Sequence, residues 1–309
     1  MKCRLTIGNG LWLLWKSLSF IKVGNNLLSV FGVLWLVIEV FTFFNKQEIV
    51  NQIKEFWGLF VFIGIIIVIY QNWPKNKFSY KVNNRDVFIT LQIGDIFKSD
   101  GALIIPVNNR LDVDNHGIIA KSSSILRLFI DKVYNQKHNY LASDISCELK
   151  DSEKFYSNFI LTENPLTYKI GTVVPIYRDE KQYYLLCSST LNGQNRSKST
   201  EDDLRSSLIE LWAFLSHCGS KDNLVIPIIG TGRGRIQMTR EEVIKEIVLS
   251  FLSSLDIESY CEQLTICIHP NDIKKYNVNI EGITDFIRLH CMNANFSRRN
   301  HMSFGQTIT

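Results

Sequence analysis

The sequence predicts a hairpin of two transmembrane helices followed by an α/β domain with a largely parallel or mixed sheet. Two apolar runs support the hairpin, since residues 27–44 contain one charged residue and residues 56–70 contain none. The α/β domain follows from alternation beyond residue 85. There, short apolar runs typical of buried strands are separated by longer segments with apolar residues at helical spacing.

Length favours a membrane crossing for the two runs. The first run covers 18 residues, which reach ~27 Å as a helix and nearly match a hydrocarbon core of ~30 Å. The second run is long enough when it extends to Trp73, with a tryptophan at each membrane interface. The alternatives are two buried core helices or, for the first run, a signal peptide. No A-x-A-like cleavage site follows that run.

Basic residues set the expected orientation of the hairpin. Four precede the first run, Lys75, Lys77 and Lys81 follow the second, and the connection holds only Lys46 and Lys54. Because cytoplasmic flanks carry the excess of Lys and Arg, we expect both termini in the cytoplasm and a multi-pass protein with residues 27–74 in the lipid bilayer. Residues 1–26, rich in Trp and Leu, form either an interfacial segment or an additional packed helix.

Charge and cysteine content argue against two classes of site. Residues 1–74 carry six basic and three acidic residues, and the remainder carries 28 and 27, so the α/β part is nearly neutral. Binders of nucleic-acid polymers usually show a basic surplus, so we expect no such partner. The seven cysteines form no C-x-x-C pair and lie apart from the six histidines. This spacing argues against a metal site and fits reduced cytoplasmic thiols.

The expected elements of the α/β domain lie within residues 75–292. We expect single strands at 86–93, 102–107, 223–229 and 263–269, and a strand hairpin at 171–178 and 182–190. We expect helices at 122–135, 199–219, 239–254 and 281–289, of which the second and third open with Ser/Thr caps and acidic residues. Residues 74–84 read as a polar linker, and residues 293–309 as a loose tail.

The segment PIIGTGRGRI, residues 227–236, places three glycines and two arginines between a buried strand and a helix. In α/β sheets, ligands bind beyond the carboxyl ends of the strands, and glycines let backbone N–H groups approach a phosphate. The loop matches neither the P-loop nor the dinucleotide fingerprint. It is therefore either an anion-binding loop or a tight turn with solvated arginines. The candidate ligand contacts are Gly230, Thr231, Gly232, Arg233, Gly234 and Arg235.

Three stretches lie in the order in which one family carries its ligand-binding motifs. They are Gly94-Asp95-Ile96, the segment from Ile105 through Asn108 to Leu111, and residues 227–234. These stretches resemble the macro domain, a three-layer α/β/α module that binds ADP-ribose. The resemblance implies that Asp95 and Ile96 bind adenine, that Asn108 contacts the distal ribose, and that the glycine loop holds the diphosphate. The family's other diphosphate loop falls on Gly117, Ile118, Ile119 and Ala120.

Two departures from the family pattern favour a reader over a hydrolase. Family hydrolases use the first Asn of the N-A-A-N-x-x-L motif, and Ile105 replaces it here. Of the glycine run only Gly117 remains, and the nearby Asp112 and Asp114 read as a solvated loop. The resemblance therefore implies no catalytic residue and no enzyme. A membrane-anchored ADP-ribosyl hydrolase, or a scaffold that docks ADP-ribosylated proteins, is the alternative.

Two transmembrane helices followed by a macro domain resemble the membrane effectors of type II Thoeris, a bacterial anti-phage system. The resemblance implies that a TIR-domain enzyme consumes NAD and releases an ADP-ribose derivative, described as histidine-ADP-ribose. The macro domain binds this signal, needs no other cofactor, and the protein forms a homo-oligomer that disrupts the bacterial inner membrane. Without the resemblance, the residues predict only a nucleotide-sized anion pocket joined to a membrane hairpin.

Overall fold

The structure is a computed structural model that describes most of the chain. The described residues are 20–44, 57–71, 75–111, 113, 124–152, 167–191, 196–219, 223–232, 234–255 and 259–294. The chain divides into two units, Met1–Asn76 and Lys77–Thr309. The predicted tail at 293–309 lies outside the described residues beyond Ala294, as does the predicted interfacial segment before Phe20.

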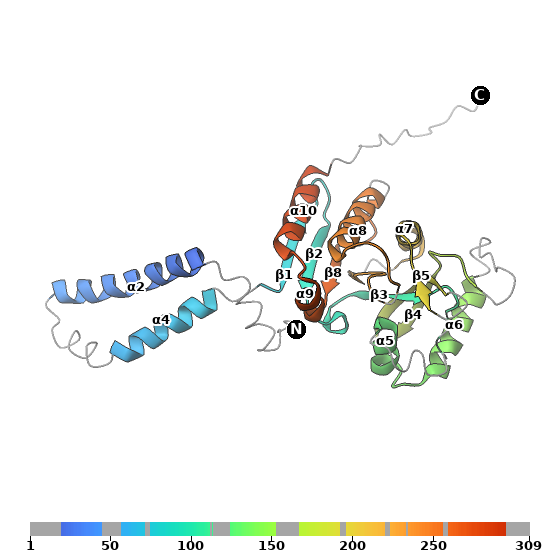
Figure 1. Cartoon of the computed structure of the whole chain (residues 1–309), viewed down its shortest axis with the longest axis horizontal. Helices are drawn as coiled ribbons and strands as arrows, with labels where there is room; N and C mark the ends of the chain where they lie inside the picture. The colour runs from blue at the N-terminus through green and yellow to red at the C-terminus, as the bar shows by residue number, and fades with distance from the viewer. Residues whose placement is uncertain are drawn as a thin grey trace, which may run out of the picture. The chain divides into compact units, whose positions relative to one another are not determined.

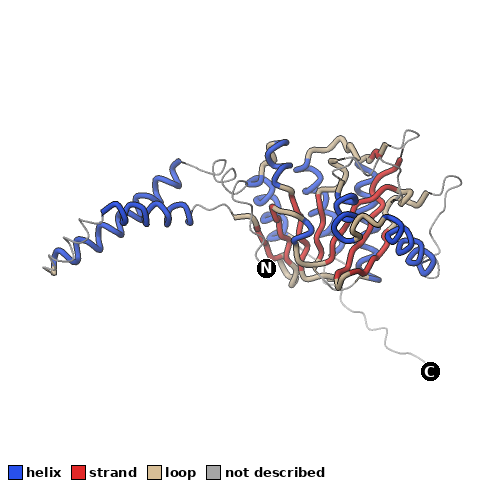
Figure 2. Tube along the Cα trace, turned by 90° about the horizontal axis from the view of Figure 1, so that it is seen from below, coloured by secondary structure: helices blue, strands red, loops and turns tan. Residues whose placement is uncertain are grey.

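Two apolar helices make up the described part of the first unit. Helix α2 spans Phe20–Phe43, helix α4 spans Trp57–Gln71, and the two lie side by side (Figures 1 and 2). Helix α2 begins inside the segment expected to be interfacial, so helical backbone extends before residue 27. Among the described residues, no helix combines the length and the hydropathy that a membrane crossing requires.

The second unit is built on a mixed sheet. Its described strands are β1 Lys77–Lys81, β2 Phe88–Ile93, β3 Ala102–Asn108, β4 Val173–Arg178, β5 Lys181–Leu191, β6 Ser197–Lys198, β7 Leu224–Pro227 and β8 Gln263–Ile268. Their order is β1-β2-β8-β7-β3-β5-β4, and β6 pairs with β5. Strands β2, β8, β7, β3 and β5 are parallel to their neighbours in this series, whereas β1, β4 and β6 pair antiparallel. The mixed sheet predicted from sequence is confirmed.

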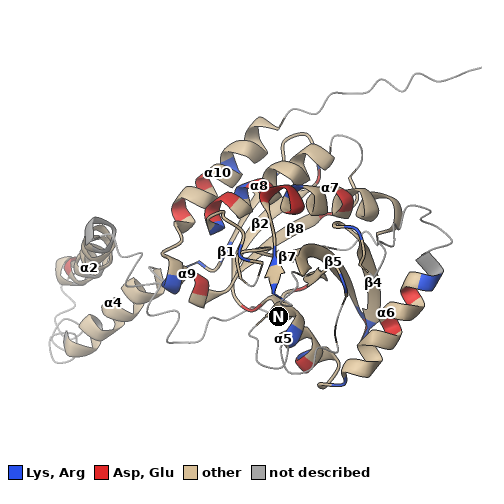
Figure 3. Ribbon diagram, turned by 45° about the vertical axis from the view of Figure 1, so that its right-hand side comes forward, with Lys and Arg blue, Asp and Glu red and all other residues tan. Residues whose placement is uncertain are grey.

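Helices cover both faces of this sheet. They are η1 Ile96–Lys98, α5 Ile125–Val133, α6 His138–Ser152, α7 Glu201–Cys218, α8 Arg240–Ser254, α9 Pro270–Tyr276 and α10 Ile280–Asn293. Helices α7, α8 and α10 lie on one face, and α5 and α6 on the other (Figures 1 and 3). The result is the three-layer α/β/α arrangement, with the sheet in the middle.

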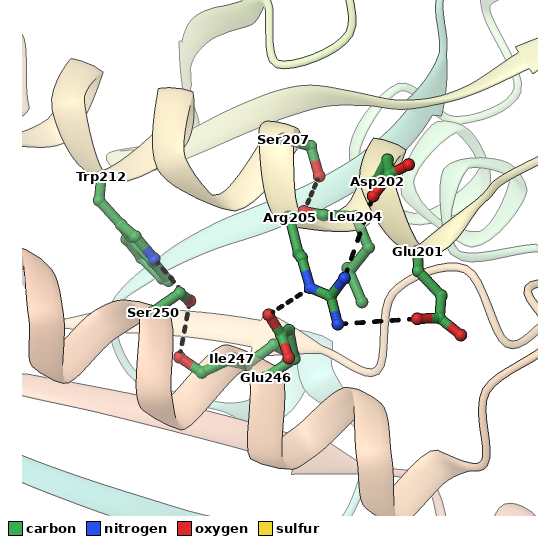
Figure 4. Close-up of polar contacts among 9 residues, drawn as sticks. All are labelled: Glu201, Asp202, Leu204, Arg205, Ser207, Trp212, Glu246, Ile247 and Ser250. Carbon is green, nitrogen blue, oxygen red and sulfur yellow. Dashed lines mark hydrogen bonds and ion pairs between the residues drawn. The ribbon is translucent and has the colours of Figure 1, made fainter.

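Helices α7 and α8 show how the sequence builds one outer layer. Each begins with a capping box, formed by Thr200 with Asp203 in α7 and by Thr239 with Glu242 in α8, which satisfies backbone N–H groups at the helix start. Between the helices, Trp212 Nε1 of α7 donates to Ser250 Oγ of α8 at 3.0 Å (Figure 4). One polar bond therefore joins the two helices within a contact that also includes the packing of Trp212 on Phe251.

An ion-pair network lies at the exposed end of the same contact. The guanidinium of Arg205 contacts Glu246 of the other helix at 2.9 Å, and Glu201 and Asp202 of its own helix at 3.6 and 4.0 Å (Figure 4). Exposed pairs of this kind stabilise a protein by about 0–1 kcal/mol each. The stability of the layer therefore comes mainly from its buried apolar side chains.

The predicted strands and helices of the α/β domain are all present, with boundaries shifted by a few residues. The hairpin β4–β5 turns through Asp179 and Glu180, whose φ angles of 51° and 58° suit a two-residue turn. The predicted linker at 74–84 is wrong in part, because Lys77–Lys81 forms the edge strand β1. An edge strand with lysines at both ends and alternating exposure has the composition of a linker.

Helices α6 and α9 were not predicted from the sequence. The apolar residues of α6 are sparse, and only Leu141 and Ile145 are buried among its described side chains. Helix α9 has seven residues, too few to show a clear helical period. Its start is nevertheless marked by Pro270, which occupies the first turn of the helix and directly follows the strand expected at 263–269.

Ile105, which replaces the first Asn of the family motif, lies in the middle of β3 with no exposed surface. It belongs to the core cluster that also contains Phe129 and Leu185. Restoring an asparagine at this position would place an amide in an apolar core, where a polar group without partners costs free energy.

Ile105→Asn is therefore expected to lower the free energy of unfolding by about 2–4 kcal/mol. Ile105→Val, which removes one methylene group, is expected to cost about 0.5–1.5 kcal/mol. Chemical unfolding followed by tryptophan fluorescence measures both variants. Equal stability of the two would show that position 105 tolerates a polar group.

Candidate functional site

A topological switch point lies between strands β3 and β7. From β7 the chain continues through α8 to β8 on one side, whereas from β3 it continues through α5, α6 and β4 to β5 on the other. Where connections leave neighbouring strands in opposite directions, a crevice forms beyond the carboxyl ends of these strands. The loops that begin after Asn108 and after Pro227 therefore flank the place where such a crevice is expected.

Strands β3 and β7 separate as they approach this edge. They pair only through Ala102 with Leu224 and Leu103 with Val225, after which β3 continues along β5 and β7 along β8. Each strand contains a proline beyond the last shared pair, Pro106 in β3 and Pro227 in β7, and proline cannot donate a ladder hydrogen bond. The sequence thus favours an opening at this place in the sheet.

The glycine loop closes on itself beside the crevice. The N–H of Ile236 donates to the carbonyl of Gly230 at 3.2 Å, and the next helix, α8, begins three residues later behind Thr239. The loop is tied to β6 and β5 by Ser199, whose N–H donates to Gly234 O at 2.7 Å and whose hydroxyl donates to Ser188 O at 2.8 Å. The loop is held from both ends.

The three glycines of the loop have different roles. Gly230 has φ +77°, a conformation that side chains with a Cβ rarely adopt. A Cβ on Gly234 would lie 2.7 Å from Ser199 Oγ and 2.9 Å from Gly230 O, so close packing requires this glycine. A Cβ on Gly232 would meet nothing within 4 Å. A tight structural turn therefore explains Gly230 and Gly234 but gives no reason for glycine at 232.

The remaining described residues of the loop face outward. Thr231 is half-buried, and Arg235 is exposed with a left-handed backbone of φ 52°. Arg235 precedes the start of α8 at Arg240 by five positions in the chain, and the N-terminal N–H groups of that helix carry positive partial charge. The loop therefore leads into an element whose first turn favours an anion.

Asp95 follows β2 at the same edge of the sheet and caps η1. Its Oδ1 accepts from the N–H of Phe97 at 3.1 Å, and its Oδ2 accepts from Lys132 Nζ of α5 at 2.7 Å. Burial opposes ionisation of this carboxyl, but the hydrogen bonds from Lys132 and Phe97 outweigh burial and hold the pKa of Asp95 below its ordinary value. Asp95 is therefore a carboxylate, an acceptor only, at neutral pH.

The positions of Ile96 and Asn108 differ in what they offer a ligand. The side chain of Ile96 is buried in the core, so its predicted contact with a ligand would be made through the backbone. Asn108 is half-buried, and its Oδ1 accepts from Arg110 N–H at 2.9 Å, which leaves the amide NH₂ as a donor. A register shift between β3 and β5 occurs at Asn108, where irregular pairing re-aims side chains.

Distances along the sheet edge set the length of a ligand that contacts both ends of the site. In the order β2-β8-β7-β3, Asp95 follows β2 and Asn108 ends β3, and these two strands lie three places apart. At ~4.8 Å per strand the separation is ~14 Å, with the glycine loop after β7 between them. A molecule that reaches both residues is elongated, and its middle lies near the positive end of α8.

Five of the predicted contacts lie outside the described residues. They are Arg233 and the four residues Gly117, Ile118, Ile119 and Ala120, and the same holds for Asp112 and Asp114. The site as described therefore rests on Asp95, Asn108 and the loop from Gly230 to Arg235 without Arg233.

Comparison with known proteins decides the family. The sequence profile described as "Thoeris protein ThsA, Macro domain" matches residues 89–269, more than half of the chain. The chain belongs to this family. The match begins in β2 and ends just after β8, so the ThsA macro domain contains the switch point, Asp95, Asn108 and the glycine loop.

A solved macro domain is similar in structure at low sequence identity. The Oceanobacillus iheyensis macrodomain with MES bound has a TM-score of 0.46 and 10% identity, and the match covers 69% of this chain and 94% of that chain. No curated protein matches the chain.

Sequence patterns did not point to two residues that contact the site in the ThsA macro domain, or to the cap of α9. Lys132 reaches Asp95 from α5, Ser199 holds the glycine loop, and His269 caps α9 directly after β8. Lys132 and Ser199 approach from distant parts of the sequence. His269 lay within the expected strand, and only Pro270 after it signalled the change of element.

The different roles of the glycines lead to different effects on stability. Gly232→Ala is expected to change the free energy of unfolding by less than about 0.5 kcal/mol, because the added methyl group meets no atom. Gly234→Ala is expected to lower it by about 1–3 kcal/mol, because Ser199 and Gly230 must move. Chemical unfolding of both variants checks this order, and a larger loss for Gly232→Ala would contradict it.

Proposed function

We propose that the protein is an effector whose macro domain binds an ADP-ribose derivative and transmits this signal to a membrane. The observation that carries the proposal is the arrangement along one sheet edge. An acceptor at Asp95, the glycine loop and an amide donor at Asn108 lie in series over ~14 Å. An ADP-ribose unit has the matching order of groups, namely an aminopurine, a diphosphate and a second ribose.

Each part of the ligand has a candidate partner in this proposal. The carboxylate of Asp95 accepts from the adenine amino group, the diphosphate lies over Gly232 near the start of α8, and the NH₂ of Asn108 donates to the distal ribose. Open space at Gly232 supports the middle contact, because a bare backbone there allows close approach. Histidine-ADP-ribose, made by a TIR-domain enzyme from NAD, is the specific signal that we propose.

We propose that the domain reads its ligand without cleaving it. Family hydrolases use an asparagine where this chain has Ile105, and that side chain is fully buried in the core. No polar side chain at 105 is thus available to position an attacking water. Turnover of ADP-ribose derivatives by the purified protein would instead favour an ADP-ribosyl hydrolase.

We propose that the helices α2 and α4 are embedded in the bacterial inner membrane. Large apolar side chains are exposed along both, with Trp35 68%, Phe62 60% and Ile66 48% exposed. Apolar surface of this extent on neighbouring helices is uncommon in water and marks a membrane or protein contact. The single acid of α2, Glu39, accepts from Trp35 Nε1 at 2.9 Å, which lowers the cost of placing it in lipid.

Asp95→Ala is expected to weaken binding of ADP-ribose to the full-length protein in detergent by about 1–3 kcal/mol, because the adenine amino group loses its acceptor. Titration calorimetry measures this change. The matched control is Asp86→Ala, which removes the same charge from the opposite end of β2, where Asp86 is paired with Lys81 and almost fully exposed.

Two results separate the parts of this prediction. Gly232→Val, whose Cβ would meet nothing within 4 Å, is also expected to weaken binding by crowding the diphosphate. If Asp95→Ala binds as tightly as Asp86→Ala, the adenine contact is wrong, whereas failure of the parent protein to bind would remove the proposed ligand.

Ligand is expected to act on membranes by assembling several copies. One two-helix hairpin has too little surface to line a pore, and a ligand shifts assembly only by binding the assembled state more tightly. We expect histidine-ADP-ribose to release dye from lipid vesicles that contain the full-length protein, and to enlarge the particle in detergent by light scattering. With Asp95→Ala we expect both effects to require a higher ligand concentration, in proportion to the loss of affinity.

A chain without residues 1–76 is the second control and is expected to release no dye. Equal particle size with and without ligand, well above the dissociation constant, would exclude the assembly mechanism. Such a result would leave a membrane-tethered reader of ADP-ribose derivatives.

A further inference from the structure

Lys132 occupies the surfaces that an aminopurine bound to Asp95 would use. Its ammonium lies 2.7 Å from Asp95 Oδ2 and 4.6 Å from the centroid of the Phe97 ring. An amino group that bonds to this carboxylate, attached to a flat base that stacks on this ring, needs the same two places. Lys132 therefore holds the position of the base amino group.

With Lys132 in place, both carboxylate oxygens of Asp95 accept a hydrogen bond from the protein. Oδ1 already accepts from the N–H of Phe97, so the ammonium covers the other oxygen of the carboxylate. A carboxylate and an ammonium both lose hydration when they are partly buried, and pairing offsets that cost. The side chains are 30% and 42% exposed, which leaves Lys132 a path to water.

Helix α5 carries Lys132 to this position from a different layer of the fold. Asp95 follows β2, whereas Lys132 belongs to the last turn of α5, on the face of the sheet opposite α7 and α8. The cation–π contact with Phe97 adds a second interaction for the same ammonium. Two interactions together give the lysine a defined place rather than a freely moving one.

We propose that Lys132 is a specificity-determining residue, which occupies the acceptor of Asp95 in the empty site and is displaced by a base that carries an amino group. The proposal rests on the proposed binding of an ADP-ribose unit. It adds that the site selects for bases with an amino group, because only a donor can replace the ammonium on the carboxylate. A base with a carbonyl in that place cannot, although it can accept from Lys132 itself.

The test compares Lys132→Met with Lys98→Met in the full-length protein. Both variants remove one positive charge near Asp95, but Lys98 is exposed and acts on the carboxylate only over distance. The ligands are ADP-ribose and its hypoxanthine analogue, which has a carbonyl in place of the amino group. Titration calorimetry gives the affinity of each protein for each ligand.

We expect Lys132→Met to bind ADP-ribose about three- to five-fold more tightly than Lys98→Met, because the ligand no longer has to break the ion pair with Asp95. This factor corresponds to the usual contribution of a partly exposed ion pair. We expect no such gain for the hypoxanthine analogue, so the ratio of the two affinities rises. A carbon-detected NMR titration is expected to show that the pKa of Asp95 rises more in Lys132→Met than in Lys98→Met.

Other outcomes overturn the proposal in distinguishable ways. Equal or weaker ADP-ribose binding by Lys132→Met, with binding by the parent intact, would make Lys132 a partner of the ligand and leave the proposed function standing. An unchanged pKa of Asp95 would show that the contact is absent in solution. If the parent binds neither ligand, the proposed function and this inference both fail.

Discussion

The separation of β3 from β7 is the constraint on which the site depends. The two strands share a short register and then continue with different neighbours, because their connections leave toward opposite sides of the sheet. This topology brings two loops that are far apart in the sequence to one edge of the sheet, at the position where α/β folds bind ligands. The prolines near the carboxyl ends of both strands remove ladder donors where the strands part.

The glycine loop requires a left-handed backbone at one position and close packing at another, and glycine suits both. Gly230 supplies a backbone conformation and Gly234 supplies close packing against Ser199, so both serve the loop itself. Gly232 serves neither purpose, and space above it is open. A hydrogen-bonded loop with one unobstructed position suits recognition of a phosphate by backbone N–H groups, because a bare backbone allows close approach.

The α/β domain has almost no net charge, but individual charged groups lie at defined positions along one edge of its sheet. The chain beyond the apolar helices is nearly neutral, yet Asp95, Lys132 and the start of α8 place definite charges along one edge. Such an arrangement gives a small ligand several specific partners without attracting polyanions over long distances. Near-neutrality also lets copies of the domain approach one another, which the proposed assembly requires.

The sequence by itself determined the alternation of strands and helices, the mixed sheet and the position of the glycine loop, because periodicity and turn residues act locally. The candidates Asp95 and Asn108 came from the resemblance of short motifs to those of the macro domain. Only the tertiary structure decided that β1 pairs at the sheet edge, that the Ile96 side chain is buried, and that the three glycines have separate roles. It also brought Lys132 to Asp95 across 37 positions. Packing between distant segments leaves no pattern in the chain, which is why sequence reasoning missed that contact.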